Sequence, residues 1–260
     1  MTTDLGKPCA GQETGDLTRS YAYTQTFCVI FALWWVTLCF FYVFPQIDLV
    51  VAKWFFVPFT CQETPNALGI CGHFPLSRDD FHKGLRKFLF FLPSVIAIIL
   101  ACMTALELRR RRRGVKKLDF RYYGAALVSF VVGPYILVNL WLKTHSNRPR
   151  PYETDIFGGK HMFEPAGSFA GTCNNNCSFI SGEGAGAGWL FCLIILVPPA
   201  LRPLLVPPIV VVAFVTPALR VAWGGHYLSD AVLGWMSSPV IFFGVLALTE
   251  VTRRRKILLA

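Results

Sequence analysis

Residues 220–230 read RVAWGGHYLSD and join two uncharged runs of membrane-spanning length. Arg220, His226 and Asp230 therefore lie where one apolar segment gives way to the next. Ionisable groups at a membrane boundary are costly to place and usually serve a function. His226 and Asp230 are four residues apart, so on a helix they would share a face and the carboxylate could orient the imidazole. The stretch predicts a reactive histidine at a membrane edge.

Similar uncharged runs recur along the chain, which is 54% hydrophobic and only 15% charged. A stretch of about 20 apolar residues is enough for a helix to cross the core of a bilayer. The sequence therefore predicts an all-α, polytopic membrane bundle with six transmembrane helices. The six runs are residues 27–44, 88–106, 122–142, 184–201, 203–219 and 231–249.

The expected organisation is one membrane domain between two short tails. Residues 1–20 are polar and lack periodicity, which predicts a mostly unstructured cytoplasmic tail. Residues 21–252 form the six-span domain, and residues 253–260 form a basic cytoplasmic tail. A loop follows the first span at residues 48–87, and its apolar segment 50–59 is expected to lie in the membrane interface.

The net charge of +10 is concentrated beside apolar runs, chiefly at residues 109–117 and 253–256. Such clusters are typical of cytoplasmic loops, and this placement argues against nucleic-acid binding. An even number of spans puts both termini on one side, which carries more Lys and Arg than the other. The positive-inside rule then places both termini in the cytoplasm and His226 on the exterior side.

The nine cysteines do not form one framework. Four fall inside apolar runs and are expected to be buried thiols: Cys28, Cys39, Cys102 and Cys192. Four more fall in the two longest polar loops: Cys61, Cys71, Cys173 and Cys177. In an oxidising compartment these four could pair in three ways, of which Cys61–Cys71 with Cys173–Cys177 is the most local. A structural zinc site is the competing interpretation, but the spacings match no known zinc pattern.

The unusual polar residues of the chain fall on one predicted face of the membrane. They follow the third span (Lys143, Arg148 and Arg150, before Pro151), open the fourth span (Ser181, Gly182 and Glu183) and lie between the fifth and sixth (Arg220, His226 and Asp230). Cationic side chains that lie close together repel one another unless an anion lies among them. Phosphate suits such a cluster, because arginine binds its oxygens bidentately and lysine adds a point charge. The glycine-rich run 182–188 would start a helix whose free backbone N–H groups face the same place, or would serve as a small-residue packing face.

These residues resemble the motifs of the type 2 phosphatidic acid phosphatase superfamily, which shares its site with vanadium haloperoxidases. The family pattern is Lys-x6-Arg-Pro, then Pro-Ser-Gly-His, then Ser-Arg-x5-His-x3-Asp. The resemblance covers residues 143–230 and extends to the six-span layout. The matching residues are Lys143, Arg150 and Pro151 in the first motif, Ser181 and Gly182 in the second, and Arg220, His226 and Asp230 in the third.

The resemblance implies a role for each residue. His226 would attack phosphorus and form a phosphohistidine, while Asp230 would hold the imidazole tautomer that leaves the attacking nitrogen free. The charge on the equatorial oxygens would be stabilised by Lys143, Arg150, Arg220, the Ser181 hydroxyl and the Gly182 N–H. No metal or other cofactor is expected, because three fixed cations take that role.

The chain departs from the family pattern in two motifs. Leu219 stands where the third motif has serine, and Ile180 and Glu183 replace the proline and histidine of the second motif. That histidine protonates the leaving group in the family. We hypothesise that Glu183 is the general acid here, since a protonated carboxyl can do the same task. The alternatives are a site that needs no strong acid, or one that uses His145 or His161.

Three neighbouring residues are expected to lie outside the site. Arg148 is interpreted as a solvated or lipid-headgroup-binding side chain. Trp223 and Tyr227 are interpreted as anchors in the membrane interface.

The sequence thus predicts an integral membrane phosphatase, a phosphoric monoester hydrolase, with a lipid-linked phosphate as its only expected partner. The run NCSFISGE at residues 176–183 resembles the bacterial lipid A phosphatase branch, so the 4′-phosphate of lipid A is the expected target. The expected location is the bacterial inner (plasma) membrane, with the site facing the periplasm. The alternatives are undecaprenyl pyrophosphate, phosphatidylglycerophosphate or phosphatidate phosphatases, and a non-catalytic lipid-phosphate binder or transporter.

Overall fold

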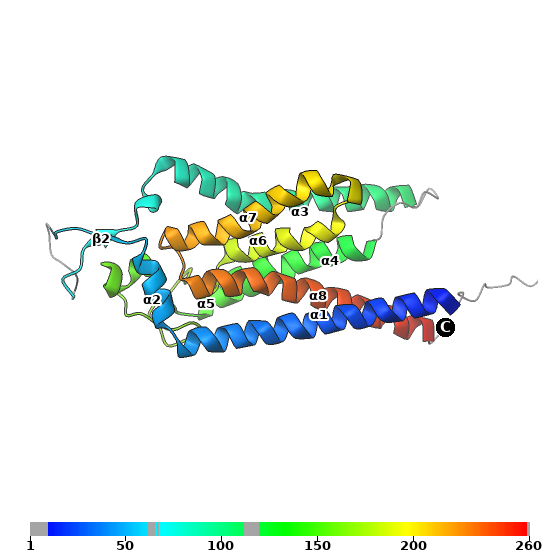
Figure 1. Cartoon of the computed structure of the whole chain (residues 1–260), viewed down its shortest axis with the longest axis horizontal. Helices are drawn as coiled ribbons and strands as arrows, with labels where there is room; N and C mark the ends of the chain where they lie inside the picture. Colours follow the sequence, from blue (N-terminus) through cyan, green and yellow to red (C-terminus); the bar gives the residue numbers. More distant parts are fainter. Residues whose placement is uncertain (1–9, 62–65, 67, 112–119, 259–260) are drawn as a thin grey trace, which may run out of the picture.

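Long helices run side by side along one axis of the computed structural model, which describes residues 10–61, 66, 68–111 and 120–258 (Figure 1). The helix α1 begins and α8 ends at the same end of this bundle, as an even number of crossings requires (Figure 1). The long elements are α1 (Ala10–Val43), α3 (Asp80–Arg111), α4 (Phe120–Phe130) with its π-helical continuation η2 (Val131–Leu142), α6 (Gly182–Cys192), α7 (Arg202–Ala222) and α8 (Leu228–Leu258).

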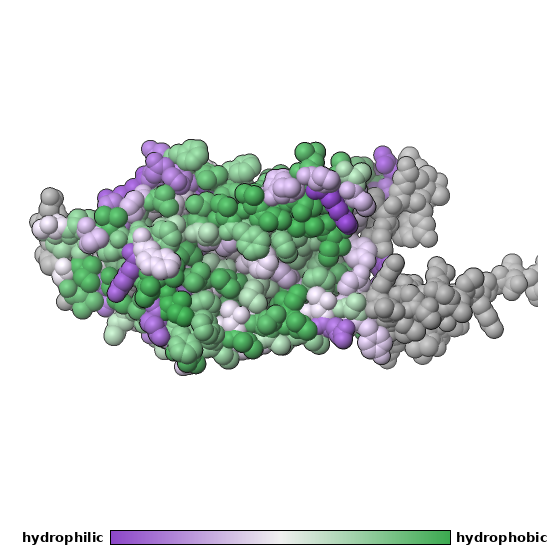
Figure 2. Space-filling view, viewed as in Figure 1, coloured by the Kyte–Doolittle hydropathy of each residue, from purple (hydrophilic) through white to green (hydrophobic). Residues whose placement is uncertain are grey.

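Five segments are long and apolar enough to cross a membrane: Tyr21–Val43, Asp80–Arg110, Arg121–His145, Pro199–Ala222 and Leu228–Thr252. Figure 2 shows a broad hydrophobic surface over the middle of the bundle, with hydrophilic side chains gathered toward its two ends. Such a band is what the hydrocarbon core of a bilayer requires of the surface that it contacts. The chain is a multi-pass membrane protein with an all-α fold.

The fourth expected span is shorter than its uncharged sequence run at 184–201. The helix there covers Gly182–Leu196, including the 3-10 turn η5 (Leu193–Leu196). It stops because Val197 adopts φ −72° and ψ 120°, the extended conformation favoured before a proline. At 1.5 Å per residue this segment covers about 22 Å, less than the ~30 Å bilayer core. A second 3-10 turn, η6 (Pro199–Leu201), leads directly into α7.

The short α6 lies at the centre of the bundle, and its small residues let α8 approach closely. A Cβ added to Gly188 would lie 2.1 Å from the carbonyl oxygen of Trp235 on α8, so only glycine fits there. On the other side of α6, the fully buried Trp189 donates through Nε1 to the Ala126 carbonyl on α4 at 2.7 Å. The glycine-rich run therefore acts as a packing face.

Helix extends into both expected tails, although the N-terminal one was predicted to be mostly unstructured. Helix α1 begins at Ala10, inside the expected unstructured tail, and residues 1–9 lie outside the described residues. Helix α8 continues to Leu258 through most of the expected basic tail. The core of the basic loop, residues 112–119, also lies outside the described residues.

The connections that follow α1, η2 and α7 collect at the end of the bundle opposite the termini (Figure 1). The expected loop 48–87 contains α2 (Gln46–Lys53), a two-stranded antiparallel pair β1 (Val57–Pro58) and β2 (Gly72–His73), and the turn η1 (Pro75–Ser77). The loop ends earlier than predicted, because Asp79 accepts a hydrogen bond from the His82 N–H at 3.0 Å and so caps α3. The charged stretch 80–87 is therefore helical. Short turns α5 (Lys143–His145), η3 (Pro151–Glu153) and η4 (Asp155–Phe157) complete this end.

The loop cysteines pair in the most local way that the sequence allows, as Cys61–Cys71 and Cys173–Cys177. Of the expected buried thiols, only Cys192 is buried. The other three, Cys28, Cys39 and Cys102, are exposed on outer helix faces. The prediction was wrong for these three because an uncharged run does not distinguish a side chain facing lipid from one facing the core.

Candidate active site

His226 lies in the short connection between α7 and α8 and is 1% exposed. Its Nδ1 is 2.8 Å from the carbonyl oxygen of Ser178. Because a carbonyl oxygen can only accept, Nδ1 carries the proton. The other ring nitrogen, Nε2, makes no hydrogen bond with the described residues and keeps its lone pair. The imidazole is therefore held in the tautomer that a nucleophile needs.

The surroundings of His226 favour its neutral form. Burial lowers the pKa of His226 well below its ordinary value of 6.5. The positive charges of Arg220, Lys143 and Arg150 lower this pKa further. The imidazole is thus uncharged at neutral pH while three cations surround it.

Asp230 contacts His226 less directly than expected. Its Oδ2 is 3.9 Å from His226 Nδ1, beyond hydrogen-bond distance. The same oxygen accepts instead from Ser178 Oγ at 2.6 Å and from the Tyr227 N–H at 3.1 Å. The imidazole is oriented by the Ser178 carbonyl, and Asp230 holds the Ser178 side chain. Sequence reasoning missed Ser178, because a backbone carbonyl 48 residues away leaves no pattern in the sequence.

Arg148 differs sharply from the solvated side chain that was expected, since it is fully buried. Its guanidinium pairs with both Asp230 and Asp48, the latter at 2.8 Å. Its Nε donates to the Glu164 carbonyl at 2.9 Å, and its Cζ lies 4.5 Å from the centre of the Tyr227 ring. Arg148 thus joins α2, the loop before α6 and the start of α8 beneath His226. A lone aspartate in the apolar stretch of α2 was the available signal for this network.

The two aromatic residues beside His226 are not interfacial anchors, contrary to prediction. Trp223 is 5% exposed, and its ring centre lies 5.4 Å from Arg86 Cζ and 5.6 Å from Arg220 Cζ. Tyr227 is fully buried against Arg148. Both rings support arginines at the site rather than contacting a membrane surface.

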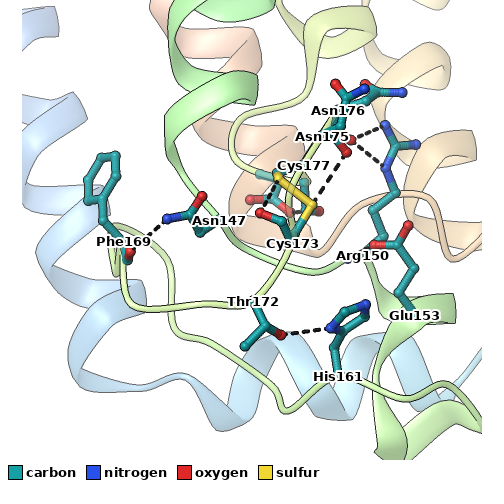
Figure 3. The surroundings of a disulfide bond; sticks show 12 residues. Asn147, Arg150, Glu153, His161, Phe169, Thr172, Cys173, Asn175, Asn176 and Cys177 are labelled. Carbon is teal, nitrogen blue, oxygen red and sulfur yellow. Dashed lines mark hydrogen bonds between the residues drawn. A yellow bond between two sulfur atoms is a disulfide. The ribbon is translucent and has the colours of Figure 1, made fainter.

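Arg150 is positioned by the loop that the Cys173–Cys177 disulfide closes (Figure 3). Its Nε and Nη2 donate to the Asn176 carbonyl at 3.1 and 2.8 Å. Figure 3 shows the Arg150 side chain reaching up to this loop from the segment that carries Glu153. Within the described part of the chain, the Arg150 guanidinium forms no ion pair with a carboxylate; the Glu153 carboxylate accepts a hydrogen bond only from the Arg150 backbone N–H, at 2.9 Å. A buried arginine with only a carbonyl neighbour is prepared to receive an anion.

Lys143 and the start of α6 come together as the sequence predicts. A Cβ added to Gly182 would lie 3.3 Å from Lys143 Nζ and 2.6 Å from Asn139 Oδ1, so the glycine leaves the ammonium its space. The Ser181 hydroxyl caps α6 by accepting from the Gly184 N–H at 3.1 Å. Its backbone N–H donates to the Asp230 carbonyl at 3.0 Å, which ties this turn to α8.

Glu183 lies between two arginines. Its Oε1 is 3.3 Å from Arg220 Nε, an ion pair without hydrogen-bond alignment, and accepts a hydrogen bond from Arg86 Nε at 3.2 Å. Arg86 was missed because its charged stretch was expected to lie in a loop, whereas α3 carries it to the site. Glu183 therefore fixes two cations, which is a second role beside the hypothesised proton donation.

The alternative acids are occupied elsewhere. His145 is exposed, and its Nδ1 is 2.8 Å from the Trp141 carbonyl oxygen. The Nδ1 of His161 is 2.7 Å from Thr172 Oγ1 on the outer loop (Figure 3). Neither forms a hydrogen bond with the residues around His226 in the described structure.

A cavity of about 650 Å³ opens beside the site and is lined on its inner side by Arg150, Arg220, Trp223 and Gly225. It is large enough for a phosphorylated headgroup. Among the described residues, no cluster of three or more His, Cys, Asp or Glu side chains is placed to bind a metal ion. The groups that surround the cavity floor are those that stabilise transferring phosphoryl oxygens.

Comparison with known proteins gives consistent matches. The PAP2 superfamily matches residues 119–254, which include every predicted site residue. A lipid A 4′-phosphatase of Rhizobium etli is 44% identical over 230 residues, covering 88% of this chain and 90% of the relative. A lipid A 4′-phosphatase of Rhizobium leguminosarum is 43% identical over 228 residues, covering 88% and 98%. One from Francisella tularensis subsp. novicida is 29% identical over 197 residues, covering 74% and 82%. No solved structure gives a significant match.

Proposed function

This chain belongs to the PAP2 superfamily and is a membrane phosphatase of phosphoric monoesters, and we propose that it removes the 4′-phosphate of lipid A at the periplasmic face of the bacterial inner membrane. The choice of lipid A is supported by two relatives of that name, which are 43–44% identical over most of both chains. The chemistry is supported chiefly by one observation: His226 Nδ1 lies 2.8 Å from the Ser178 carbonyl oxygen, so Nε2 is the ring nitrogen that keeps its lone pair.

The first step is attack of His226 Nε2 on phosphorus. The nitrogen lone pair forms the N–P bond as the ester P–O bond breaks, and the leaving alkoxide takes up a proton. The imidazole ring becomes positively charged in the phosphohistidine, and its Nδ1–H keeps the hydrogen bond to the Ser178 carbonyl. The Asp230 carboxylate, 3.9 Å from Nδ1, stabilises this charge as it develops.

Lys143, Arg150 and Arg220 stabilise the phosphoryl oxygens in the transition state. Arg150 and Arg220 are only 7% and 4% exposed, so their interactions with an anion are weakly screened by water. The Gly182 N–H at the start of α6 adds a backbone donor. Ser181 orients this turn through its cap, and its hydroxyl proton remains available to a phosphate oxygen.

Glu183 is the proposed proton donor to the leaving alkoxide. As a carboxylate it pairs with Arg86 and Arg220; once the substrate phosphate engages Arg220, the carboxyl group holds the proton that it donates. Its side chain is 7% exposed at the edge of the site. After the lipid alcohol leaves, a water molecule attacks the phosphohistidine and Glu183 takes one of its protons. The N–P bond breaks, inorganic phosphate is released and His226 returns to its neutral form. The acid of the first step thus serves as the base of the second.

The periplasmic location is supported by charge and by cysteine chemistry. Basic residues are more numerous on the side of the two termini, which the positive-inside rule assigns to the cytoplasm. Both disulfides belong to the loops at the site end, and disulfides persist in oxidising compartments such as the periplasm.

Turnover of defined lipids by the purified protein tests the proposal. The panel is lipid A, undecaprenyl pyrophosphate, phosphatidylglycerophosphate and phosphatidate, each in neutral detergent micelles. We expect phosphate release to be fastest from lipid A, only at the 4′ position, and to be abolished by His226→Ala. Preferential hydrolysis of another lipid would contradict the substrate, and full activity of His226→Ala would contradict the mechanism.

A further inference from the structure

The cavity beside the site extends well beyond the residues that the reaction uses. On its outer side it is lined by Arg78 and by the first turns of α3, with Lys83, Arg86 and Lys87. These turns lie next to β2 at the end of the bundle opposite the termini (Figure 1). Lys83, Arg86 and Lys87 are three and four residues apart, so the helix presents them on one face. The cavity therefore has a second cationic wall.

The cations of this cavity outnumber the carboxylates that could neutralise them. Six of its lining residues are Arg or Lys, and none of the described lining residues is acidic. Two carboxylates pair with three of these cations: Asp80 with Lys83 at 2.8 Å, and Glu183 with Arg86 and Arg220. The described carboxylates form no ion pair with Arg78, Lys87 or Arg150.

One bound phosphate does not account for all three unpaired cations. The reacting phosphate, held over His226, accounts for Arg150 together with Lys143 and Arg220. Arg78, which follows η1, and Lys87, on α3, are exposed and line the same cavity, and they come from a different part of the chain than Arg150 and Arg220. Unpaired cations held on one concave wall repel each other, and this repulsion is relieved when an anion binds between them.

The two walls are physically connected. Arg86 on α3 and Arg220 on α7 share Glu183 Oε1 at 3.2 and 3.3 Å, and both lie over the ring of Trp223. The same carboxylate and the same indole hold both arginines. The second cationic wall and the phosphate site therefore keep a fixed position relative to each other, and one ligand can contact both.

We propose that Arg78 and Lys87 bind a second anionic group on the headgroup of the substrate lipid while its other phosphate reacts at His226. The substrate class is thus a lipid whose headgroup carries at least two acidic groups, a second phosphate or a carboxylate. This inference rests on the proposed lipid phosphatase function and adds the feature by which the enzyme selects among lipid monoesters. A second phosphate held by two cations contributes about tenfold to kcat/KM.

The test compares two substrates and two matched variants in neutral micelles. The substrates are lipid A with both of its phosphates, and the derivative that retains only the 4′-phosphate. The test variant is Arg78→Gln/Lys87→Gln. The control variant is Lys53→Gln/Lys160→Gln, which removes two exposed lysines that do not line the cavity. We expect a preference of about tenfold for the bisphosphate in the unmodified enzyme and in the control, and a preference near one in the test variant. Equal preference in all three proteins overturns the inference.

The source of the second anion is tested by adding phosphatidylglycerol to the micelles. If Arg78 and Lys87 bind the substrate's own second group, phosphatidylglycerol leaves hydrolysis of the monophosphate unchanged or inhibits it. If it accelerates that hydrolysis, and does so only when both cations are present, the anion comes from a neighbouring lipid and the inference is overturned. The preference for the bisphosphate should also shrink as ionic strength rises, because these side chains are exposed.

Binding measurements separate failure of this inference from failure of the proposed function. If the unmodified enzyme hydrolyses neither lipid, the proposed function fails. Native mass spectrometry of the His226→Ala protein with each lipid still reports on the second wall. If the protein binds the bisphosphate about tenfold more tightly than the monophosphate, the result supports a site for the second anionic group. Equal affinity for the two lipids overturns that inference.

Discussion

Arg148 and Arg150 are two residues apart in the chain and have opposite environments. Arg148 is fully buried and pairs with two carboxylates, Asp48 and Asp230. Arg150 is nearly as buried but is held only by the Asn176 carbonyl. The first arginine has its charge compensated by the protein, and the second leaves its charge for a ligand.

The same contrast separates the two layers around His226. The layer beneath it is closed: the Ser178 carbonyl holds the imidazole directly, Asp230 and Arg148 act on it indirectly, and their charges and hydrogen bonds are satisfied. The layer above it is open, with Lys143 and Arg150 lacking acidic partners among the described residues. Arg148 and Arg150 differ in their pairing and hardly in their burial, and this difference is the reason to propose Arg150, and not Arg148, as a phosphate ligand.

The largest expected effect is on stability, from Arg148→Met. This change leaves two carboxylates buried and unpaired, which costs about 3–5 kcal/mol of unfolding free energy. Arg150→Met should cost far less, because it leaves no carboxylate without a partner. Thermal unfolding of both variants in the same detergent measures the difference. Equal unfolding temperatures would mean that the pairing does not separate the two arginines.

The next effect is on catalysis, from Arg150→Gln. Loss of one donor to a transition-state oxygen lowers kcat by about 10²–10³-fold, or about 2.7–4 kcal/mol. The unfolding temperature should stay near that of the unmodified enzyme. Lipid A turnover and thermal unfolding, measured on the same preparation, check both parts. A stable variant with unimpaired turnover would remove Arg150 from the site.

The Glu183→Gln variant tests which of two roles Glu183 has. Glu183 pairs with two arginines, and it is also the proposed acid. If it donates a proton, the variant loses about 10²-fold on an alkyl phosphate, whose leaving group is a strong base. It should lose little on p-nitrophenyl phosphate, whose leaving group needs no proton. Equal losses on the two substrates would limit Glu183 to holding Arg220 and Arg86.

The smallest expected effect is a shift of the pH profile. Because burial and three cations lower the pKa of His226, the nucleophile stays neutral below pH 6.5, and kcat/KM should fall only at more acidic pH. In Arg150→Gln one of these cations is missing, so the pKa of His226 rises and the acidic limb moves to higher pH. Profiles from about pH 4.5 to 8 on both proteins measure the shift. If the acidic limb of the kcat/KM profile is the same in both proteins, the charge of Arg150 does not affect the pKa of His226.

The motif spacing predicted which residues the fold brings to one end of the bundle, but not how they connect. The predicted residues Lys143, Arg150, Gly182, Arg220 and His226 lie around one end of the bundle, because each motif sits at the end of an apolar run. The Ser178 carbonyl was not predictable, since backbone atoms carry no residue identity. Arg148 was misread because charge beside a membrane usually means solvent, and only the fold brings Asp48 to it.

Helix boundaries were predictable where composition changes abruptly and less so elsewhere. Uncharged runs located five of the six expected spans, while the helix of the fourth ends early because two prolines follow Val197. The start of α3 at Asp80 was missed, since the charged residues of its first turns resemble those of a loop. For the same reason the sequence did not predict that Arg86, or the second cationic wall, lies at the cavity.

Trapping a phosphate on His226 tests most directly the central claim that a neutral, oriented imidazole attacks phosphorus among unpaired cations. The enzyme is mixed with lipid A labelled with ³²P at the 4′ position, quenched in base and digested, since phosphohistidine is stable in base and labile in acid. We predict label on the peptide containing His226, attached at Nε2, with none in His226→Ala and more in a variant whose second step is slow. Rapid turnover with no label on His226 at any quench time would contradict this mechanism.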